Sequence, residues 1–214
     1  MFLKGGQFQL FLRTNTNFYR KDEIGMKIKK TLSVFMAFMM LLCAVPFVAG
    51  AEGEELTENG YTYTVENGEA TITGSDENIS GDIVIPSSIG GYPVRKIGWH
   101  AFAGRDDLTG VTIPNGVERI YQIAFNRCSN LKYISLPDSL TDIGSDVFAY
   151  CSSLEKIEVS KNNTVYHSKD NCLIKTEEKI LIKGCKNSVI SNDGSVTIIS
   201  HCAFAGCDGL ESIT

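Results

Sequence analysis

The chain contains the stretch RKIGWHAFAGRDDLTGVTIPNGV at residues 95–117, followed directly by ERIYQIAFNRCSNLKYISLPDSL at residues 118–140. These two blocks have the same length and align without a gap. Apolar residues recur in columns, which are Ile97, Ile120 and Ile143; Phe102, Phe125 and Phe148; Leu108, Leu131 and Leu154; and Ile113, Leu136 and Val159. After an interruption the pattern resumes with Ile199, Phe204, Leu210 and Ile213. Repetition with a period in this range predicts a solenoid with one coil per repeat.

The apolar spacing inside one block indicates a short strand followed by a compact return turn. Leu108–Ile113 and Leu131–Leu136 have the alternation of strands, and Pro114 and Pro137 end them because proline cannot donate to a ladder. The segment Ala124–Cys128 suits a single helical or 3-10 turn whose Phe points inward. The sequence therefore predicts an α/β solenoid that is mostly β, with one parallel strand per repeat.

A single repeat could not fold alone. It buries about six apolar side chains, worth roughly 1.5–3 kcal/mol each, against an ordering cost of about 1.5 kcal/mol per residue. Stacking joins the inward side chains of neighbouring repeats into one core. The predicted core columns are Phe102, Phe125, Phe148 and Phe204, and Cys128, Cys151 and Cys207.

The run I-x4-A-F-x-x-C-x-x-L-x-x-I-x-I-P-x-x-V resembles the BspA-like leucine-rich repeat family, a class of secreted and surface repeats found mainly in bacteria. The resemblance covers residues 61–214, with a first repeat at 82–102 and a long insertion at 160–196. It implies a right-handed coil and a protein-binding function, adhesion to host or other cells among them. Arg105 stands where the family has Cys, and Ser160 where it has Pro.

The N-terminal residues have the pattern of an export signal that begins at Met26. Residues 1–25 lack periodicity, which indicates either residues added by assigning the start of the gene too early or a disordered segment. Residues 26–51 combine a basic start, an apolar core and the small-residue site Ala49-Gly50-Ala51, so we expect a signal peptide cleaved after Ala51. The alternative is an uncleaved transmembrane anchor, because the apolar run is close to the shortest length that spans a bilayer.

The charge of the mature part limits its partners. Removing residues 1–51 lowers Lys plus Arg from 20 to 13 and Asp plus Glu from 25 to 23, which gives a net charge of −10 (13 minus 23). An acidic surface argues against nucleic acid or an anionic membrane as a partner. Extracellular proteins remain as the partner class, and the sequence predicts no oligomeric state.

Two hairpins flank or interrupt the repeats. Residues 52–81 are predicted to form an acidic lead-in and a β-hairpin cap around Asn67-Gly68, which covers the open edge of the first coil. Within the repeat domain, 82–214, the segments Cys172–Lys175 and Ile180–Lys183 form a second hairpin. The spacing leaves open whether this hairpin projects from the solenoid or supplies a coil. Because the sequence ends inside a predicted strand, we expect a longer protein.

Six cysteines follow the signal, and an exported protein can form disulfides. Cys128, Cys151 and Cys207 share a column and are predicted to be buried thiols, whereas Cys172 and Cys185 are the pair best placed for a disulfide. Zinc sites commonly use paired C-x2-C motifs, and the sequence has none. The nearest approach is His201-Cys202 with Cys207, so no metal site and no cofactor are predicted.

The sequence does not predict an enzyme. The three histidines, His100, His167 and His201, occur in unrelated settings, and no G-x-S-x-G motif or phosphate-binding glycine loop is present. Nucleophilic catalysis requires a Ser or Cys beside a His that a carboxylate orients.

The outward faces of the repeat strands are the candidate binding surface. Alternation places on it a polar set with Tyr133 as the natural anchor: Thr112, Lys132, Tyr133, Ser135, Glu155, Lys156 and Glu158. The alternative is a solvated sheet with charge pairs such as Lys132 with Glu155. We therefore expect a secreted or cell-surface interaction module, or else the targeting repeats of a larger secreted enzyme. An intracellular or membrane-embedded protein would follow only if Met1 were the start and the apolar stretch were retained.

Overall fold

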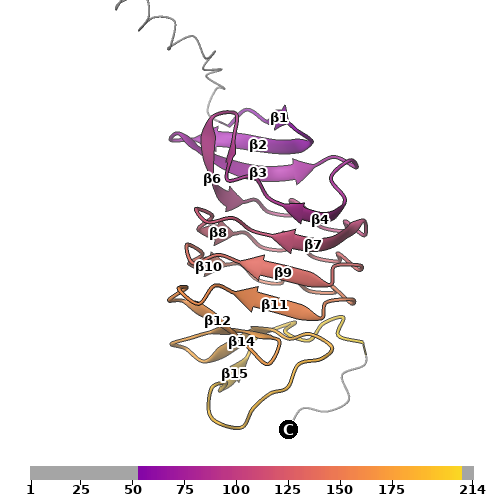
Figure 1. Ribbon diagram of the computed structural model, residues 1–214, viewed down its shortest axis with the longest axis vertical. Helices are drawn as coiled ribbons and strands as arrows, with labels where there is room; N and C mark the ends of the chain where they lie inside the picture. The colour runs from indigo at the N-terminus through magenta and orange to yellow at the C-terminus, as the bar shows by residue number, and fades with distance from the viewer. Residues whose placement is uncertain (1–52, 209–214) are drawn as a thin grey trace, which may run out of the picture. The chain divides into compact units, whose positions relative to one another are not determined.

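The computed structural model describes residues 53–208, which form a mostly β solenoid of stacked coils (Figure 1). The predicted extension at 1–25, the predicted signal at 26–51 and the last predicted apolar positions, Leu210 and Ile213, lie outside the described residues. None of the described residues forms a helix that could cross a membrane. The strands are β1 Leu56–Glu58, β2 Tyr61–Glu66, β3 Glu69–Ser75, β4 Gly81–Val84, β5 Ser88–Ile89, β6 Tyr92–Ile97, β7 Leu108–Thr112, β8 Arg119–Ile120, β9 Tyr133–Leu136, β10 Asp142–Ile143, β11 Lys156–Val159, β12 Tyr166–Lys169, β13 Cys172–Lys175, β14 Ile180–Lys183 and β15 Ile198–Ile199.

The strands predicted from the repeat form one parallel sheet in the order β4, β7, β9, β11 (Figure 1). Its register follows the repeat, because Val111 lies opposite Ile134, and Ile134 lies opposite Ile157. These three side chains are buried in the main core. One strand per repeat, each paired with the equivalent strand of the next repeat, agrees with the prediction.

A second sheet forms where each coil returns. Ile97 of β6 lies opposite Ile120 of β8, and Ile120 lies opposite Ile143 of β10, all in parallel pairs. Towards the N-terminus, β3 adds to β6 in parallel and pairs with β2 as an antiparallel hairpin. Asn67 and Gly68 both have positive φ at the hairpin turn, as a tight two-residue turn of this type requires.

The third side of each coil consists of turns, and the described residues contain no helix. The amides of Ala101 and Ala103 donate to carbonyl oxygens three residues earlier, but the intervening amide of Phe102 donates to Ala124 in the next coil, at 2.8 Å. A 3-10 turn would keep all of these bonds inside one coil. The predicted helical or 3-10 return turn is therefore wrong, because every second amide joins a ladder between coils.

This alternation depends on residues with a left-handed backbone. Positive φ recurs at one position of each coil, namely His100, Ile123, Asp146 and Cys202, with φ values of 62°, 51°, 56° and 57°. A second such column contains Arg127 and Tyr150. Because neighbouring coils share these conformations, equivalent side chains lie above one another along the stack.

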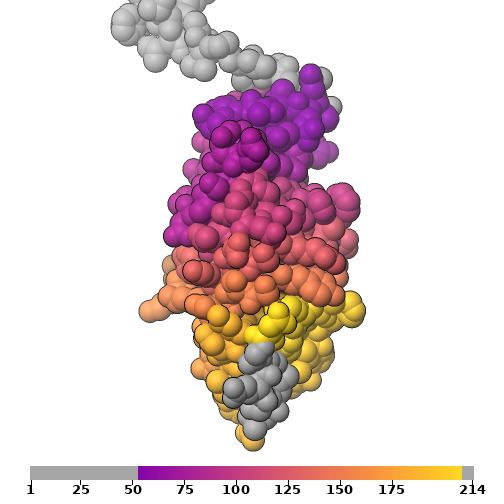
Figure 2. All heavy atoms as spheres, turned by 90° about the vertical axis from the view of Figure 1, so that its right-hand side faces the viewer, coloured from indigo at the N-terminus to yellow at the C-terminus, as the bar shows by residue number. Residues whose placement is uncertain are grey.

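The insertion supplies part of the stack instead of projecting from it. β12, β13 and β14 are successive antiparallel neighbours, and β14 pairs in parallel with β15. The predicted second hairpin coincides with β13 and β14. Tyr166, Leu173 and Cys185 are buried in the main core, and the amide of Gly184 donates to the carbonyl of Ala203 at 2.9 Å. In Figure 2 the yellow atoms of the last described residues lie next to the orange atoms of the coil before the insertion, with the gold atoms of the insertion beside and below them.

Three of the four phenylalanines of the predicted core column stack along the axis. The ring centroids of Phe102 and Phe125 are 5.0 Å apart, those of Phe125 and Phe148 are 5.8 Å apart, and all three rings are buried. Phe204 does not continue this row. It is half-buried in a second, smaller cluster and lies against Gly184, where a Cβ atom would come within 2.1 Å of its ring. The insertion causes this difference, because Gly184 of the insertion lies against the Phe204 ring and its amide bonds to the carbonyl of Ala203.

Candidate binding surface

The parallel register creates two outward columns on the sheet β4-β7-β9-β11. One column contains Asp82, Gly110, Tyr133 and Lys156, and the other contains Val84, Thr112, Ser135 and Glu158. Because side chains alternate between the two faces of a strand, both columns point away from the core. Thr112, Tyr133 and Ser135 are half-buried, and Lys156 and Glu158 are exposed. Five of the seven predicted binding residues therefore share this face.

The other two predicted residues lie just before the strands. Lys132 precedes β9 and Glu155 precedes β11, and both are exposed. The carboxylate of Glu155 forms an ion pair with Lys186 at 2.6 Å, while Lys156 pairs with Glu158 along its own strand at 2.5 Å. The solvated-sheet alternative named a charge pair between Lys132 and Glu155. In the structure Glu155 pairs with Lys186 of the insertion instead. The proximity of Lys186 lowers the pKa of the Glu155 carboxyl below its usual range.

Tyr133 lies in a gap that a glycine leaves open. A Cβ atom at Gly110 would lie 3.3 Å from the Tyr133 ring and 2.7 Å from the Asp82 carboxylate. The hydroxyl of Thr109 donates to the same carboxylate at 2.6 Å and fixes its position. Tyr133 therefore presents its ring beside an ordered acidic group, in an arrangement that combines aromatic area with a hydrogen-bond acceptor.

A groove of about 730 Å³ lies beyond the carboxyl ends of β7, β9 and β11, where β12 begins. Thr112, Ser135 and Glu158 of the outward face line it. The insertion and the turns add groove residues that the sequence did not mark as part of a binding surface, among them Asn115, Asp138, Lys161, His167 and Ser168. The only signal that could have found Asn115, Asp138 and Lys161 is their position two residues after the last apolar residue of a repeat strand, at Ile113, Leu136 and Val159. His167 and Ser168 belong to β12 of the insertion and carry no such signal.

Asn163 holds the wall of this groove in place. Its side-chain amide donates to the carbonyls of Pro137 and Leu140 at 2.8 and 2.9 Å, and its oxygen accepts from the amides of Val165 and Tyr166. One side chain thus ties the insertion to the preceding coil. His167 is anchored in turn by Thr176, with 3.0 Å between Nδ1 and the hydroxyl.

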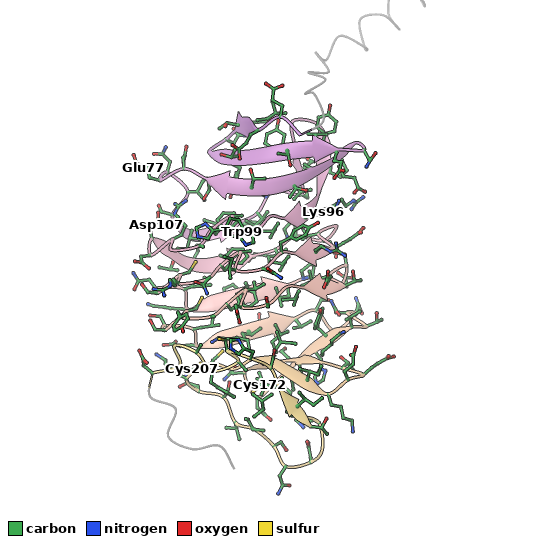
Figure 3. All side chains as sticks on the ribbon, turned by 180° about the vertical axis from the view of Figure 1, so that it is seen from behind. Glu77, Lys96, Trp99, Asp107, Cys172 and Cys207 are labelled. Atoms are coloured by element: carbon green, nitrogen blue, oxygen red, sulfur yellow. The ribbon has the colours of Figure 1, made fainter. Side chains whose placement is uncertain are left out.

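The cysteines of the described residues are all free thiols. The predicted disulfide between Cys172 and Cys185 is therefore absent from the structure, because Cys172 packs in the second cluster and Cys185 in the main core. Cys128 and Cys151 are buried, and each thiol donates to a backbone carbonyl of the preceding coil. Cys207 is half-exposed and donates to Gly184 of the insertion instead (Figure 3 shows Cys172 and Cys207 in the last coils).

The histidines do not share one site. His100 lies beside the exposed ring of Trp99, which Figure 3 labels, with 5.3 Å between ring centroids. His167 lines the groove. His201 is different, since its Nδ1 lies 3.5 Å from the Asp146 carboxylate and Cys202 follows it in the chain. The sequence gives no sign of this contact, because the two residues belong to different coils.

A stack of parallel strands with buried leucine and isoleucine columns defines a leucine-rich repeat protein. The BspA type Leucine rich repeat region matches the chain in six copies, at residues 80–180 and 175–214. The chain belongs to this family.

Solved structures of bacterial repeat proteins are similar to the chain. A leucine-rich repeat protein of T. pallidum is 28% identical, with a TM-score of 0.52, over 75% of this chain and 71% of that one. One from Bacteroides capillosus ATCC 29799 is 26% identical, with a TM-score of 0.47, over 74% and 96%. A leucine-rich cell surface protein of Faecalibacterium prausnitzii A2-165 is 20% identical, with a TM-score of 0.34, over 72% and 68%. Comparison with curated protein sequences finds no match.

Proposed function

We propose that this repeat unit is a non-catalytic module that binds an extracellular protein, and that the two outward columns with the adjoining groove are its binding surface. One observation carries the proposal. Tyr133 lies beside Gly110 and Asp82 on the outward face of the sheet. Thr112, Ser135 and Glu158 of the same face line the groove. An aromatic anchor next to a polar groove is the arrangement that protein interfaces favour.

Export of this module to the cell surface or the medium forms part of the proposal. Its support is the signal pattern at residues 26–51 and the acidic composition that follows it. N-terminal sequencing of the protein recovered outside the cell tests it. A product that begins at Glu52 is expected, and a chain that retains residues 26–51 would contradict cleavage.

The N-terminal hairpin acts, in this proposal, as a cap on the first coil. β2 and β3 bury Tyr63, Val65 and Ile72 in the main core, and β3 occupies the edge of β6 that would otherwise lack a partner. Repeat proteins need such terminal units for solubility. A variant that lacks residues 53–75 should aggregate, and a soluble, cooperatively folded product would contradict the capping role.

The binding surface can be tested with paired tyrosine variants. Affinity for a panel of immobilised extracellular matrix and cell-surface proteins would be measured for the wild type, Tyr133→Ala and Tyr121→Ala. Tyr121 lies after β8, on a different side of the coil. For the protein that binds, Tyr133→Ala should weaken affinity at least about tenfold, as an interface anchor does. Full binding by Tyr133→Ala, or an equal loss in Tyr121→Ala, would place the interface elsewhere.

A further inference from the structure

Three metal-binding side chains meet where the last described coil stacks on an earlier one. Each of Asp146, His201 and Cys202 offers one ligand atom, and these three atoms lie within 4.8 Å of one another. The coils are in direct contact here, because the amide of Tyr150 donates to the carbonyl of Ala205 at 2.9 Å. On this side of the stack the insertion does not separate the coil of Asp146 from the coil of His201 and Cys202.

The repeat geometry explains why these residues converge. Asp146 and Cys202 occupy the same column, and both have a left-handed backbone, with φ values of 56° and 57°. Equivalent conformations in stacked coils direct equivalent side chains the same way, so the thiol and the carboxylate lie one above the other. The earlier coils have His100 and Ile123 in this column. Of the coils within residues 53–208, this junction alone places a carboxylate above a thiol.

The carboxylate of Asp146 lacks a full set of partners. Its Oδ1 atom is buried and accepts no hydrogen bond. Nδ1 of the His201 imidazole lies 3.5 Å from this oxygen. A buried carboxylate oxygen without a donor costs free energy. A bound cation would satisfy this atom.

Space is available beside the three side chains. They line a cavity of about 250 Å³ together with Gly144, Ser145, Ile182 and Ser200, among others. His201 is largely exposed, with 86% of its side chain accessible, so its ring can turn without disturbing the core. A cavity of this size also leaves room for water as a fourth ligand.

We propose that Asp146, His201 and Cys202 bind one divalent transition metal ion, of the class that includes Zn²⁺ and Co²⁺. The set of one thiolate, one imidazole and one carboxylate matches the ligands of zinc and of metals of similar softness, and it does not match calcium or magnesium, which take oxygen ligands. Three protein ligands leave a coordination position open. The metal would join two coils at the end of the insertion, where the regular phenylalanine row has stopped.

The same three residues could instead act as a nucleophile, a base and an orienting carboxylate, since Cys202 Sγ lies 3.9 Å from Nε2 of His201. Such catalysis needs an imidazole that neighbouring groups hold in place, whereas the His201 side chain is 86% exposed and can turn. A metal ion, by contrast, would hold the imidazole itself and displace the thiol proton when it binds.

Titration of the purified, reduced full chain with Co²⁺ tests the proposal, because thiolate coordination produces a charge-transfer absorption in the near ultraviolet. One equivalent should bind, and excess Zn²⁺ should abolish the signal. Cys202→Ser should remove the band, and Asp146→Asn and His201→Gln should each weaken Co²⁺ binding at least about tenfold. Cys207→Ser and His167→Gln are the matched controls and should bind as the wild type does.

Circular dichroism of each metal-free variant separates loss of a ligand from loss of the fold. Absence of the band in the folded wild type would overturn the proposal, as would its loss in Cys207→Ser but not in Cys202→Ser. Rapid alkylation of Cys202 by iodoacetamide at neutral pH, without any Co²⁺ binding, would reject the metal site in favour of an activated thiol.

Discussion

The thiol of Cys128 donates a hydrogen bond to the backbone carbonyl of Phe102 in the preceding coil, with 3.1 Å between Sγ and the oxygen. Cys151 repeats this bond to Phe125 one coil later, also at 3.1 Å. In the first coil Arg105 occupies the same column, and its guanidinium donates to the carbonyls of Ser75 and Ile79. This column therefore links each coil to the preceding segment through a side-chain donor.

Replacement of Cys128 tests the value of this donor. Cys128→Ala should lower the free energy of unfolding by about 1–2 kcal/mol through lost volume. Cys128→Ser should cost no more than that, because its hydroxyl can donate to the same carbonyl and so avoids an unpaired buried group. Urea denaturation of both variants provides the comparison. A serine variant clearly less stable than the alanine variant would mean that the hydrogen bond has no role.

The stacked phenylalanines should be the most sensitive positions. Phe125 is fully buried between Phe102 and Phe148, so Phe125→Ala should cost about 3–5 kcal/mol. Tyr133 is half-buried on the outer face, and Tyr133→Ala should stay within about 0.5 kcal/mol of the wild type. Thermal and urea unfolding measure both. Similar losses for the two variants would indicate that inner and outer faces are reversed.

How far the sequence predicts the structure depends on the regularity of the repeat. Ile97, Ile120 and Ile143 could be placed together because each coil presents the same neighbours to the next. Phe204 and Cys207 could not, since both contact Gly184 of the insertion in place of the equivalent residues of a regular coil. The contact between Asp146 and His201 could not be predicted from the sequence either, because the spacing does not show that their two coils touch despite the insertion between them. The outward sheet residues followed from strand alternation, whereas the groove depends on the conformation of the insertion.

Buried thiols should be unreactive in the folded protein. Burial raises the pKa of the Cys185 thiol to about 12, so its thiolate fraction at about pH 8 is roughly one in ten thousand. Iodoacetamide labelling followed by peptide mapping should therefore modify Cys185 far more slowly than the half-exposed Cys207. In urea the two rates should converge. A disulfide between Cys172 and Cys185 under non-reducing conditions would contradict the free thiols of the structure.

Acid should destabilise the fold through carboxylates that accept hydrogen bonds. The hydroxyl and amide of Ser129 donate to Asp106 at 2.6 and 3.1 Å and lower the pKa of that carboxyl below its ordinary value of 3.8. A carboxyl with a lowered folded-state pKa contributes stability above the unfolded value, and this contribution is lost as the pH falls through the folded value.

The unfolding free energy of the wild type should therefore decrease between about pH 5 and about pH 3, and Ser129→Ala should decrease less steeply. Urea denaturation at several pH values measures the slopes. Equal slopes for the two proteins would show that this hydrogen bond does not govern the titration of Asp106. High salt provides a control, because it weakens exposed ion pairs such as that of Lys156 with Glu158 more than a short hydrogen bond.

Close backbone packing between coils should make Gly144 intolerant of any side chain. A Cβ atom there would lie 2.5 Å from the backbone nitrogen of Gln122 in the preceding coil, and the Gly144 amide itself donates to Ile120 at 2.8 Å. Backbone atoms cannot move aside as the end of a flexible side chain can, so Gly144→Ala should cost about 1–3 kcal/mol. Gly74→Ala is the matched control, because its nearest contact would be 3.8 Å away and its φ is not positive. Thermal unfolding of both variants should show a lower midpoint for Gly144→Ala alone. Equal midpoints would mean that the coils can separate at this position at little cost, contrary to the tight stacking of β8 on β10.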